Sequence, residues 1–151
     1  MRLTRAGEYA VRCVLYLSKK GKGVVVSRKE VAEHAVIPAH FLAKIAQDLA
    51  KAGMIEIRQG AKGGFALLMD PEEITLLAVV ETVIGEIFLN DCVIRPQSCE
   101  ASSNCSVHNV WMTARDQLRN TLGSVTFAQL INQPVCISEG PKVARGVGGN
   151  R

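Results

Sequence analysis

Apolar residues recur every three or four positions along the first twenty residues, and this period predicts an amphipathic helix. The helix is expected to end within residues 19–23, because positive charge and two glycines are typical of a helix C-terminus. The repeating stripe consists of Leu3, Ala6, Ala10, Val14 and Leu17.

Two shorter helices are predicted to follow. Ser27 and Glu30 form the pattern of a capping box, in which each side chain satisfies the other residue's backbone amide at a helix start. Pro38 then breaks the helical pattern, because it has no amide proton to donate. A third helix is predicted from there to Ala52, with Gly53 as its stop. Its inward-facing residues are expected to be Phe41, Leu42, Ile45, Ala46 and Leu49.

An alternating pattern after the third helix predicts a β-hairpin. Residues 54–58 alternate between apolar and polar, residues 59–64 form a glycine-rich turn, and residues 65–67 alternate again. Two short helices, a tight turn and a hairpin together indicate a winged helix-turn-helix, which is a DNA-binding module. Glycine-rich hairpins and basic helices are common separately, so the interpretation depends on their order along the chain.

Charge supports this interpretation of the first half. Residues 1–66 contain 12 Lys and Arg against 5 Asp and Glu, a net charge of +7. Residues 67–151 contain 6 against 9, a net charge of −3. A basic module that binds a polyanion, joined to an acidic module with another role, fits this distribution.

The acidic half contains a second helix signal and a group of cysteines. Asp70 to Glu73 reads as a helix start, with a helix expected to continue to Gly85. A turn-rich loop over residues 90–104 should then present two cysteines, and a third cysteine closes it, followed one helical turn later by a histidine. Such thiolate and imidazole donors suit an iron–sulfur cluster or zinc. The donors are Cys92, Cys99, Cys105 and His108.

The spacing of these donors favours a cluster over zinc. Structural zinc sites more often use cysteine pairs two to four residues apart, and no pair here is that close. Three unrelated thiols are the alternative interpretation, but cysteines concentrated in a polar loop are not typical core residues. The chain has five cysteines, an odd number, and its first residues do not read as a secretory signal, so a disulfide framework is disfavoured.

A long amphipathic helix is predicted after His108 and is expected to end at Gly123. It reads as a dimerisation element, although an ordinary core helix within one chain is the alternative. A short helix from Thr126 and a flexible tail over residues 134–151 should complete the chain. The residues expected at the dimer interface are Val110, Trp111, Ala114, Leu118 and Leu122.

The sequence resembles the IscR/NsrR-type (Rrf-two) family of bacterial winged-helix transcription regulators, over Met1 to about Gln133. The motifs are the start Met1-Arg2-Leu3-Thr4, with Gly7 and Tyr9-Ala10-Val11; the wing Gly60…Gly63-Gly64-Phe65; and the Cys92, Cys99, Cys105 and His108 set. The resemblance, closest to the iron–sulfur cluster regulator branch, implies a dimer whose cluster controls operator binding. It implies a 2Fe-2S cluster, with 4Fe-4S as the second choice. Glu8 is the fallback fourth ligand, because some relatives use an acid of the first helix.

The charge pattern and the resemblance together give the expected DNA contacts. The wing carries Gln59 where the family usually has Arg, and Ala43 stands where the cluster regulator has an acid that reads cytosine, so operator choice should differ. The expected contacts are Arg2, Thr4, Arg28, His40, Phe41, Lys44, Arg58, Gln59 and Lys62.

We therefore predict a mainly α protein with three parts. Residues 1–70 should form a winged helix-turn-helix, residues 71–133 a cluster-binding loop with dimerisation helices, and residues 134–151 a flexible tail. The expected function is a cytoplasmic, homodimeric, cluster-dependent regulator (a repressor or dual regulator) that binds a double-stranded DNA operator and no membrane. A cofactor-free or zinc-stabilised repressor is the alternative. A small redox enzyme is disfavoured, because no nucleotide-binding glycine loop, Cys-His-acid arrangement or paired carboxylates are recognisable.

Overall fold

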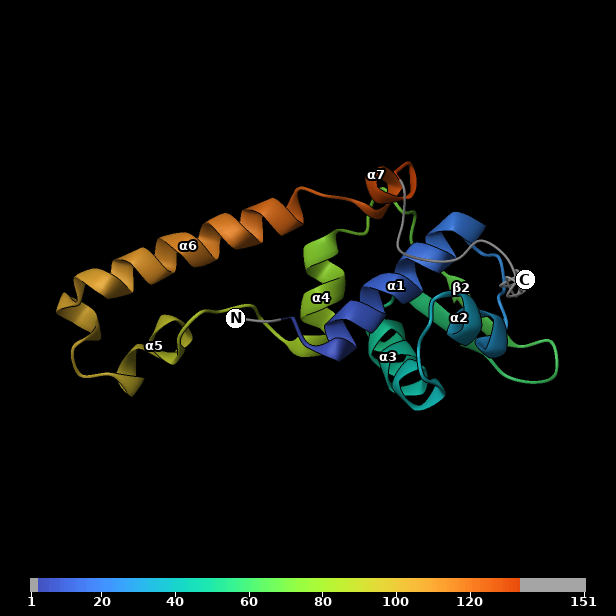
Figure 1. Cartoon of the computed structure of the whole chain (residues 1–151), viewed down its shortest axis with the longest axis horizontal. Helices are drawn as coiled ribbons and strands as arrows, with labels where there is room; N and C mark the ends of the chain where they lie inside the picture. Colours follow the sequence, from blue (N-terminus) through green and yellow to red (C-terminus); the bar gives the residue numbers. More distant parts are fainter. Residues whose placement is uncertain (1–2, 134–151) are drawn as a thin grey trace, which may run out of the picture.

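The structure is a computed structural model that describes residues 3–133. Most of this part of the chain is helical, with one antiparallel hairpin (Figure 1). The predicted flexible tail and Arg2 lie outside the described residues. The elements are α1 (Arg5–Lys20), α2 (Arg28–His34), α3 (Ala39–Lys51), β1 (Ile55–Arg58), β2 (Gly64–Leu67), α4 (Leu76–Ile84), α5 (Asp91–Ile94), the short 3₁₀ helices η1 (Pro96–Ser98) and η2 (Ser102–Asn104), α6 (Ser106–Gly123) and α7 (Phe127–Ile131).

Helix α1 forms the centre of the core, as its apolar stripe predicted. The Thr4 hydroxyl accepts a hydrogen bond from the Gly7 amide at 3.2 Å and so caps the helix N-terminus. Helices α2, α3, α4 and α7 and strand β2 all pack against α1. Ile74, Val79 and Phe127 belong to the same buried cluster as the apolar residues of α1, so α4 and α7 share the core of the winged helix.

The start of α2 differs in one bond from the predicted capping box. Ser27 Oγ accepts from the Glu30 amide at 3.1 Å, as expected. The Glu30 carboxylate, however, accepts from the Tyr16 hydroxyl at 2.7 Å and pairs with Lys20 Nζ at 2.8 Å. The side chain predicted to close the capping box therefore fastens α2 to α1.

The turn between α2 and α3 lies where Pro38 predicted it. Val36 adopts a positive φ of 54°, a left-handed conformation that β-branched residues rarely take. Pro38 itself is the N-cap of α3, and Gly53 follows the helix with φ 73°. The predicted inward face is confirmed: Leu42, Ile45, Ala46 and Leu49 are buried and Phe41 is half-buried.

The predicted wing is confirmed as an antiparallel pair in which Ile55 lies opposite Leu67. The segment before α2 adds a further bridge, because Val26 and Phe65 exchange backbone hydrogen bonds of 2.9 and 2.8 Å. A side chain at Gly64 would collide with the Val26 backbone. Only glycine therefore allows this close approach between the wing and the chain entering α2.

The predicted helix start at Asp70 is wrong. Asp70 to Glu73 form a turn in which the Glu73 amide donates to the Asp70 carbonyl at 2.8 Å, and α4 begins only after Thr75, whose side chain caps it. Ile74 is buried and its carbonyl accepts from the Phe127 amide at 2.9 Å. This pairing with the segment before α7 holds residues 74–75 extended and delays the helix.

Helix α6 extends from the body as a long arm, and α5 lies near its far end (Figure 1). None of its 18 residues is buried. The segment over residues 90–104 is more ordered than the predicted loop, since it contains α5, η1 and η2. Across residues 3–133, no helix is both long enough and apolar enough to cross a membrane.

Candidate nucleic-acid interface and cysteine segment

Two of the predicted DNA contacts, His40 and Lys44, are exposed on α3. The His40 ring lies 4.6 Å from the Phe41 ring, and Phe41 packs edge-on against Tyr9 of α1 at 5.2 Å. Lys44 Nζ lies 3.7 Å from an Asp48 carboxylate oxygen one turn along the helix. Phe41 thus packs α3 against α1 while His40 and Lys44 face solvent.

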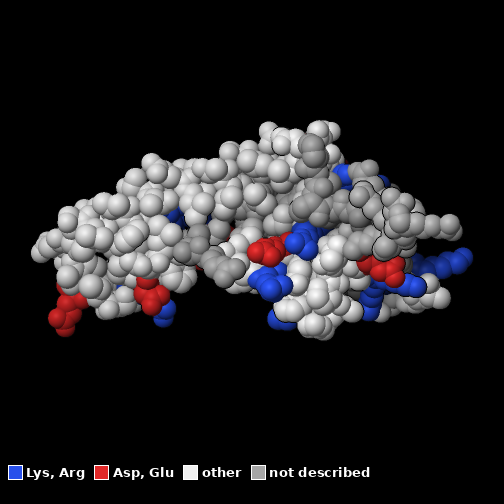
Figure 2. Space-filling model, viewed as in Figure 1, with Lys and Arg blue, Asp and Glu red and all other residues white. Residues whose placement is uncertain are grey.

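The wing and the start of α2 together present a basic surface. Arg28 Nη2 donates to Gln59 Oε1 at 3.3 Å, and the Arg28 guanidinium lies over the Phe65 ring at 5.8 Å. A pocket of about 270 Å³ opens between the wing and the start of α2. The guanidinium groups of Arg28 and Arg58 line it, and such groups are well suited to bind a phosphate. Figure 2 shows that most Lys and Arg side chains on its face lie over the winged helix. The pocket is lined by Arg28, Arg58, Gln59, Gly60 and Gly63.

The four predicted metal donors lie in the segment from α5 to the start of α6. Cys92 is within α5, Cys99 follows η1 and is exposed, and Cys105 is the N-cap of α6. His108 is in the first turn of α6, and its buried Nδ1 has no hydrogen-bond partner. Among residues 3–133, no three His, Cys, Asp or Glu side chains lie close enough together to hold a metal ion.

The donor set fits an iron–sulfur cluster by chemistry rather than by its arrangement. Thiolates and an imidazole are its usual protein ligands, and an unpartnered ring nitrogen is available to bind. Because no three of the donors lie together among residues 3–133, the segment would have to rearrange for them to meet. Glu8 lies on α1, away from α5 in Figure 1, so the fallback ligand would have to come from a second copy.

Cys13 differs sharply from these three cysteines. It is fully buried in α1, and burial raises the pKa of its thiol to about 12. A thiol held in its protonated form is a poor metal ligand, so Cys13 is a core residue.

Helix α6 divides the predicted dimer stripe between two faces. Val110 is 62% exposed and, with Ala114, lines a shallow depression on the outer side of the helix. Leu118 and Leu122 instead face the body of the same chain, where they line a groove between α1, α4 and α6. Trp111 also faces its own chain, since its indole Nε1 donates to the Asn90 side chain at 2.9 Å in the amide orientation that satisfies both groups.

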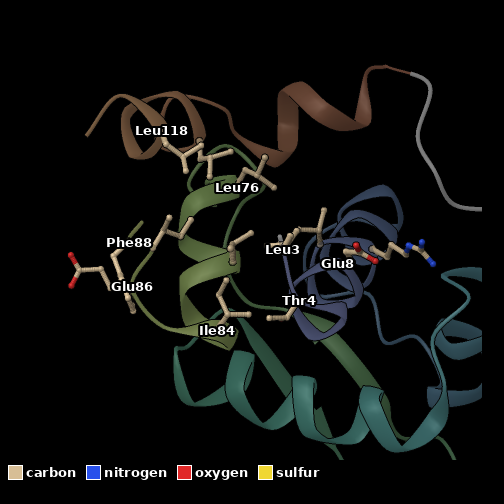
Figure 3. Close-up of a pocket in the computed structure, with 13 residues that line it drawn as sticks. Leu3, Thr4, Glu8, Leu76, Ile84, Glu86, Phe88 and Leu118 are labelled. Atoms are coloured by element: carbon tan, nitrogen blue, oxygen red, sulfur yellow. The ribbon is translucent and has the colours of Figure 1, made fainter. Parts of the chain in front are cut away.

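The groove between α1, α4 and α6 has a volume of about 720 Å³ and mostly apolar walls (Figure 3). Leu3, Leu76 and Ile84 lie along it, and Glu8 stands at one side. Thr4, predicted as a DNA contact, also lines the groove.

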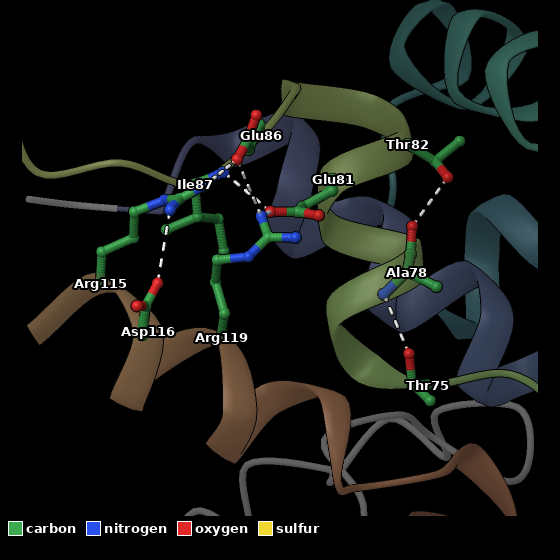
Figure 4. Close-up of polar contacts among 9 residues, drawn as sticks. All are labelled: Thr75, Ala78, Glu81, Thr82, Glu86, Ile87, Arg115, Asp116 and Arg119. Atoms are coloured by element: carbon green, nitrogen blue, oxygen red, sulfur yellow. Dashed lines mark hydrogen bonds and ion pairs between the residues drawn. The ribbon is translucent and has the colours of Figure 1, made fainter. Parts of the chain in front are cut away.

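Ion pairs join α6 to α4 and to the segment that follows it (Figure 4). Arg119 pairs with Glu81 and Glu86, and Arg115 pairs with Glu86. Glu81 also accepts from the Ile87 amide at 2.9 Å. Sequence reasoning missed these residues, although Trp111, Arg115 and Arg119 recur every four positions and so share one helix face.

Residues 3–133 match the Rrf2 family, which is described as iron-dependent transcriptional regulators. The chain belongs to the Rrf2 family. It is 31% identical over 127 residues to a protein of Aquifex aeolicus named as an HTH-type transcriptional regulator, covering 82% of this chain and 87% of that one. It is 27% identical over 132 residues to the HTH-type transcriptional regulator IscR of Serratia proteamaculans, covering 87% and 80%.

The fold is that of solved winged-helix regulators. CymR, the global cysteine regulator of B. subtilis, superposes with a TM-score of 0.72 at 24% identity, covering 89% of this chain and 99% of CymR. The Rrf2 relatives are transcriptional regulators rather than enzymes, and regulators of this family bind DNA. The predicted fold class, family and regulatory role are therefore confirmed.

Proposed function

We propose that this Rrf2 protein is a homodimeric regulator whose operator binding is controlled by an iron–sulfur cluster, 2Fe-2S in preference to 4Fe-4S. Cys92, Cys99, Cys105 and His108 would hold the cluster. The observation that carries the proposal is that all four donors lie in one segment, from α5 to the first turn of α6, in a family described as iron-dependent.

Packed helices connect the cysteine segment to α3, the helix that is expected to contact DNA. Helix α6 packs on α4, and α4 packs on both α1 and α3. Ordering the cysteine segment against α6 would therefore shift the support on which the exposed face of α3 rests. When bound, the cluster supplies a redox-active and labile group. His108 contributes a neutral ligand where a thiolate would be negative, which favours a sensor over a tightly held electron carrier.

DNA contact would involve three surfaces of the winged helix. His40 and Lys44 would enter the major groove from α3, while Arg58 and Lys62 of the wing would reach phosphates or the minor groove. Arg28 would hold a phosphate between α2 and the wing. Two such units would read half-sites about one helical turn apart.

A second copy of this chain is the expected occupant of the apolar groove. Val107 and Val110 are 51% and 62% exposed on α6, and the groove beside Leu118 offers apolar walls of matching character. An α6 of 18 residues is about 27 Å long, enough to cross a partner and bury both surfaces.

A cofactor-free regulator is the second candidate. It is favoured by the separation of the donors, because no three of them meet within residues 3–133. In that case the cysteines would be structural or respond directly to thiol chemistry, whereas in a zinc-stabilised regulator they would bind zinc.

Iron, sulfide and zinc content of protein purified without oxygen distinguishes the two candidates. The proposed function predicts a coloured protein with iron and sulfide in equal amounts, and loss of both in Cys99→Ala. Cys13→Ala is the matched control, because it removes a buried thiol and should keep the cluster. Colourless protein, or equal iron in Cys99→Ala and wild type, would reject cluster binding.

A further inference from the structure

The far end of α6 is tied to the segment that leads into the cysteines. Trp111 is the single tryptophan of the chain. In the amide orientation that satisfies both groups, the Asn90 side chain accepts from the Trp111 indole Nε1 at 2.9 Å and donates to the Leu89 carbonyl at 2.8 Å. Asn90 is the N-cap of α5, the helix that contains Cys92. The tryptophan is thus joined to a residue two positions before a proposed ligand.

The ion pairs of α6 continue the same line of contacts. Arg115 lies one turn beyond Trp111 and pairs with Glu86, and Arg119 lies a further turn along and pairs with Glu81 (Figure 4). The segment from α4 to α5 is therefore fastened at successive turns of one helix face.

We propose that the Trp111–Asn90 hydrogen bond positions Cys92 for the cluster, with Trp111 and Asn90 as positioning residues rather than ligands. This inference rests on the proposed function. Cys105 and His108 belong to the start of α6, whereas Cys92 belongs to a separate short helix. The hydrogen bond fixes the start of α5 relative to α6, so Cys92 is tied to the helix that carries Cys105 and His108, although no three of the donors meet among residues 3–133.

The hydrogen bond restricts the positions that α5 and its Cys92 can adopt before the cluster binds. Some contacts orient the metal ligands without touching the metal themselves. Removing such a contact typically lowers metal affinity by about 10- to 100-fold. Helix α5 spans only Asp91–Ile94, too short to hold its own position without such contacts.

The test compares wild type with Asn90→Ala, Asn90→Asp and Trp111→Phe. Asn90→Asp keeps the oxygen acceptor, and Trp111→Phe keeps a ring but removes the donor. Asn109→Ala, an exposed asparagine on α6, is the matched control. Tryptophan emission of the cluster-free protein and the rate at which a chelator removes iron after anaerobic reconstitution with iron and sulfide are measured, with thermal unfolding as a check on folding.

The proposal predicts that Asn90→Ala shifts the emission to longer wavelength. Asn90→Ala and Trp111→Phe should lose iron about 10- to 100-fold faster at an unchanged unfolding temperature. Asn90→Asp should largely restore retention, and Asn109→Ala should match wild type. Wild type that takes up no iron would reject the proposed function and this inference with it. Wild type that loads, beside Asn90→Ala and Trp111→Phe that retain iron equally well, would overturn this inference alone.

Discussion

Arg58 and Glu56 form an ion pair on the exposed side of β1, with Arg58 Nη2 3.1 Å from Glu56 Oε2. The two residues are separated by one position, so their side chains lie on the same face of the strand. Arg58 is a wing residue that is expected to bind a DNA phosphate. In the free protein its guanidinium is already paired with the Glu56 carboxylate. Binding a DNA phosphate would therefore require Arg58 to exchange one anion for another.

Glu56→Gln should strengthen DNA binding by about two- to fivefold at low salt, since exposed ion pairs contribute about 0.2–1 kcal/mol. Fluorescence anisotropy with a labelled promoter fragment measures the change. Glu72→Gln alters the net charge equally on an exposed residue away from the wing and serves as control. An equal gain in both variants would show that Glu56 does not restrain Arg58.

Lys62→Ala should weaken binding to all sequences alike and lower the slope of log affinity against log salt by about 1, because one phosphate contact is lost. His40→Ala should instead change the preference among sequences, since His40 is exposed on α3. Affinity measured at several salt concentrations on operator and unrelated DNA separates the two effects. Binding by wild type that is insensitive to salt would contradict the phosphate assignment.

Val110→Asp should convert dimers to monomers, because it places a charge on an exposed apolar position of α6 without disturbing the fold of one chain. Sedimentation at micromolar concentration measures the assembly, and operator affinity should fall with it. Asn120→Asp introduces the same side chain on a polar, exposed side of α6 and should remain dimeric. A wild type that sediments as a stable monomer would end the dimer proposal.

Glu30 should make stability depend on pH. Hydrogen bonds from Lys20 and Tyr16 lower the pKa of the Glu30 carboxyl below that of the unfolded chain. The resulting stabilisation is complete above the ordinary glutamate pKa and is lost as the pH falls through the lower, folded-state pKa.

The free-energy difference between wild type and Glu30→Gln should therefore shrink on acidification. We expect it to be below about 1 kcal/mol, since the pair is partly exposed. Urea unfolding at neutral and acidic pH, at one protein concentration, measures this difference. Glu33→Gln on the same helix is the control, and a difference that stays constant with pH would contradict the role of Glu30.

The winged helix was predictable because its signals are local. The α3 face follows from a period of 3.6, and Gly53 and Pro38 mark its limits within the same stretch of chain. The start of α4 was not predictable in this way. Asp70 and Glu73 satisfy one another in a turn, and the burial of Ile74 beside the distant Phe127 decides where the helix begins.

The candidate site was predictable in its chemistry and less so in its geometry. The donor types and their order were readable from Cys92 to His108. The contact of Trp111 with Asn90 was not predictable, because Asn90 is remote in sequence and apolar spacing alone gives no sign of a polar partner. Tertiary hydrogen bonds and ion pairs of this kind leave no periodic signal.

Operator affinity measured with and without the cluster tests the central claim most directly. Wild type reconstituted without oxygen and the same preparation stripped of iron are titrated against one promoter fragment, beside Cys99→Ala. The account predicts that the two wild-type forms differ in affinity by about tenfold or more, corresponding to a coupling of about 1.4 kcal/mol. Cys99→Ala should stay at the cluster-free value under both treatments. Equal affinity of the loaded and cluster-free wild type would contradict control of DNA binding by the cluster.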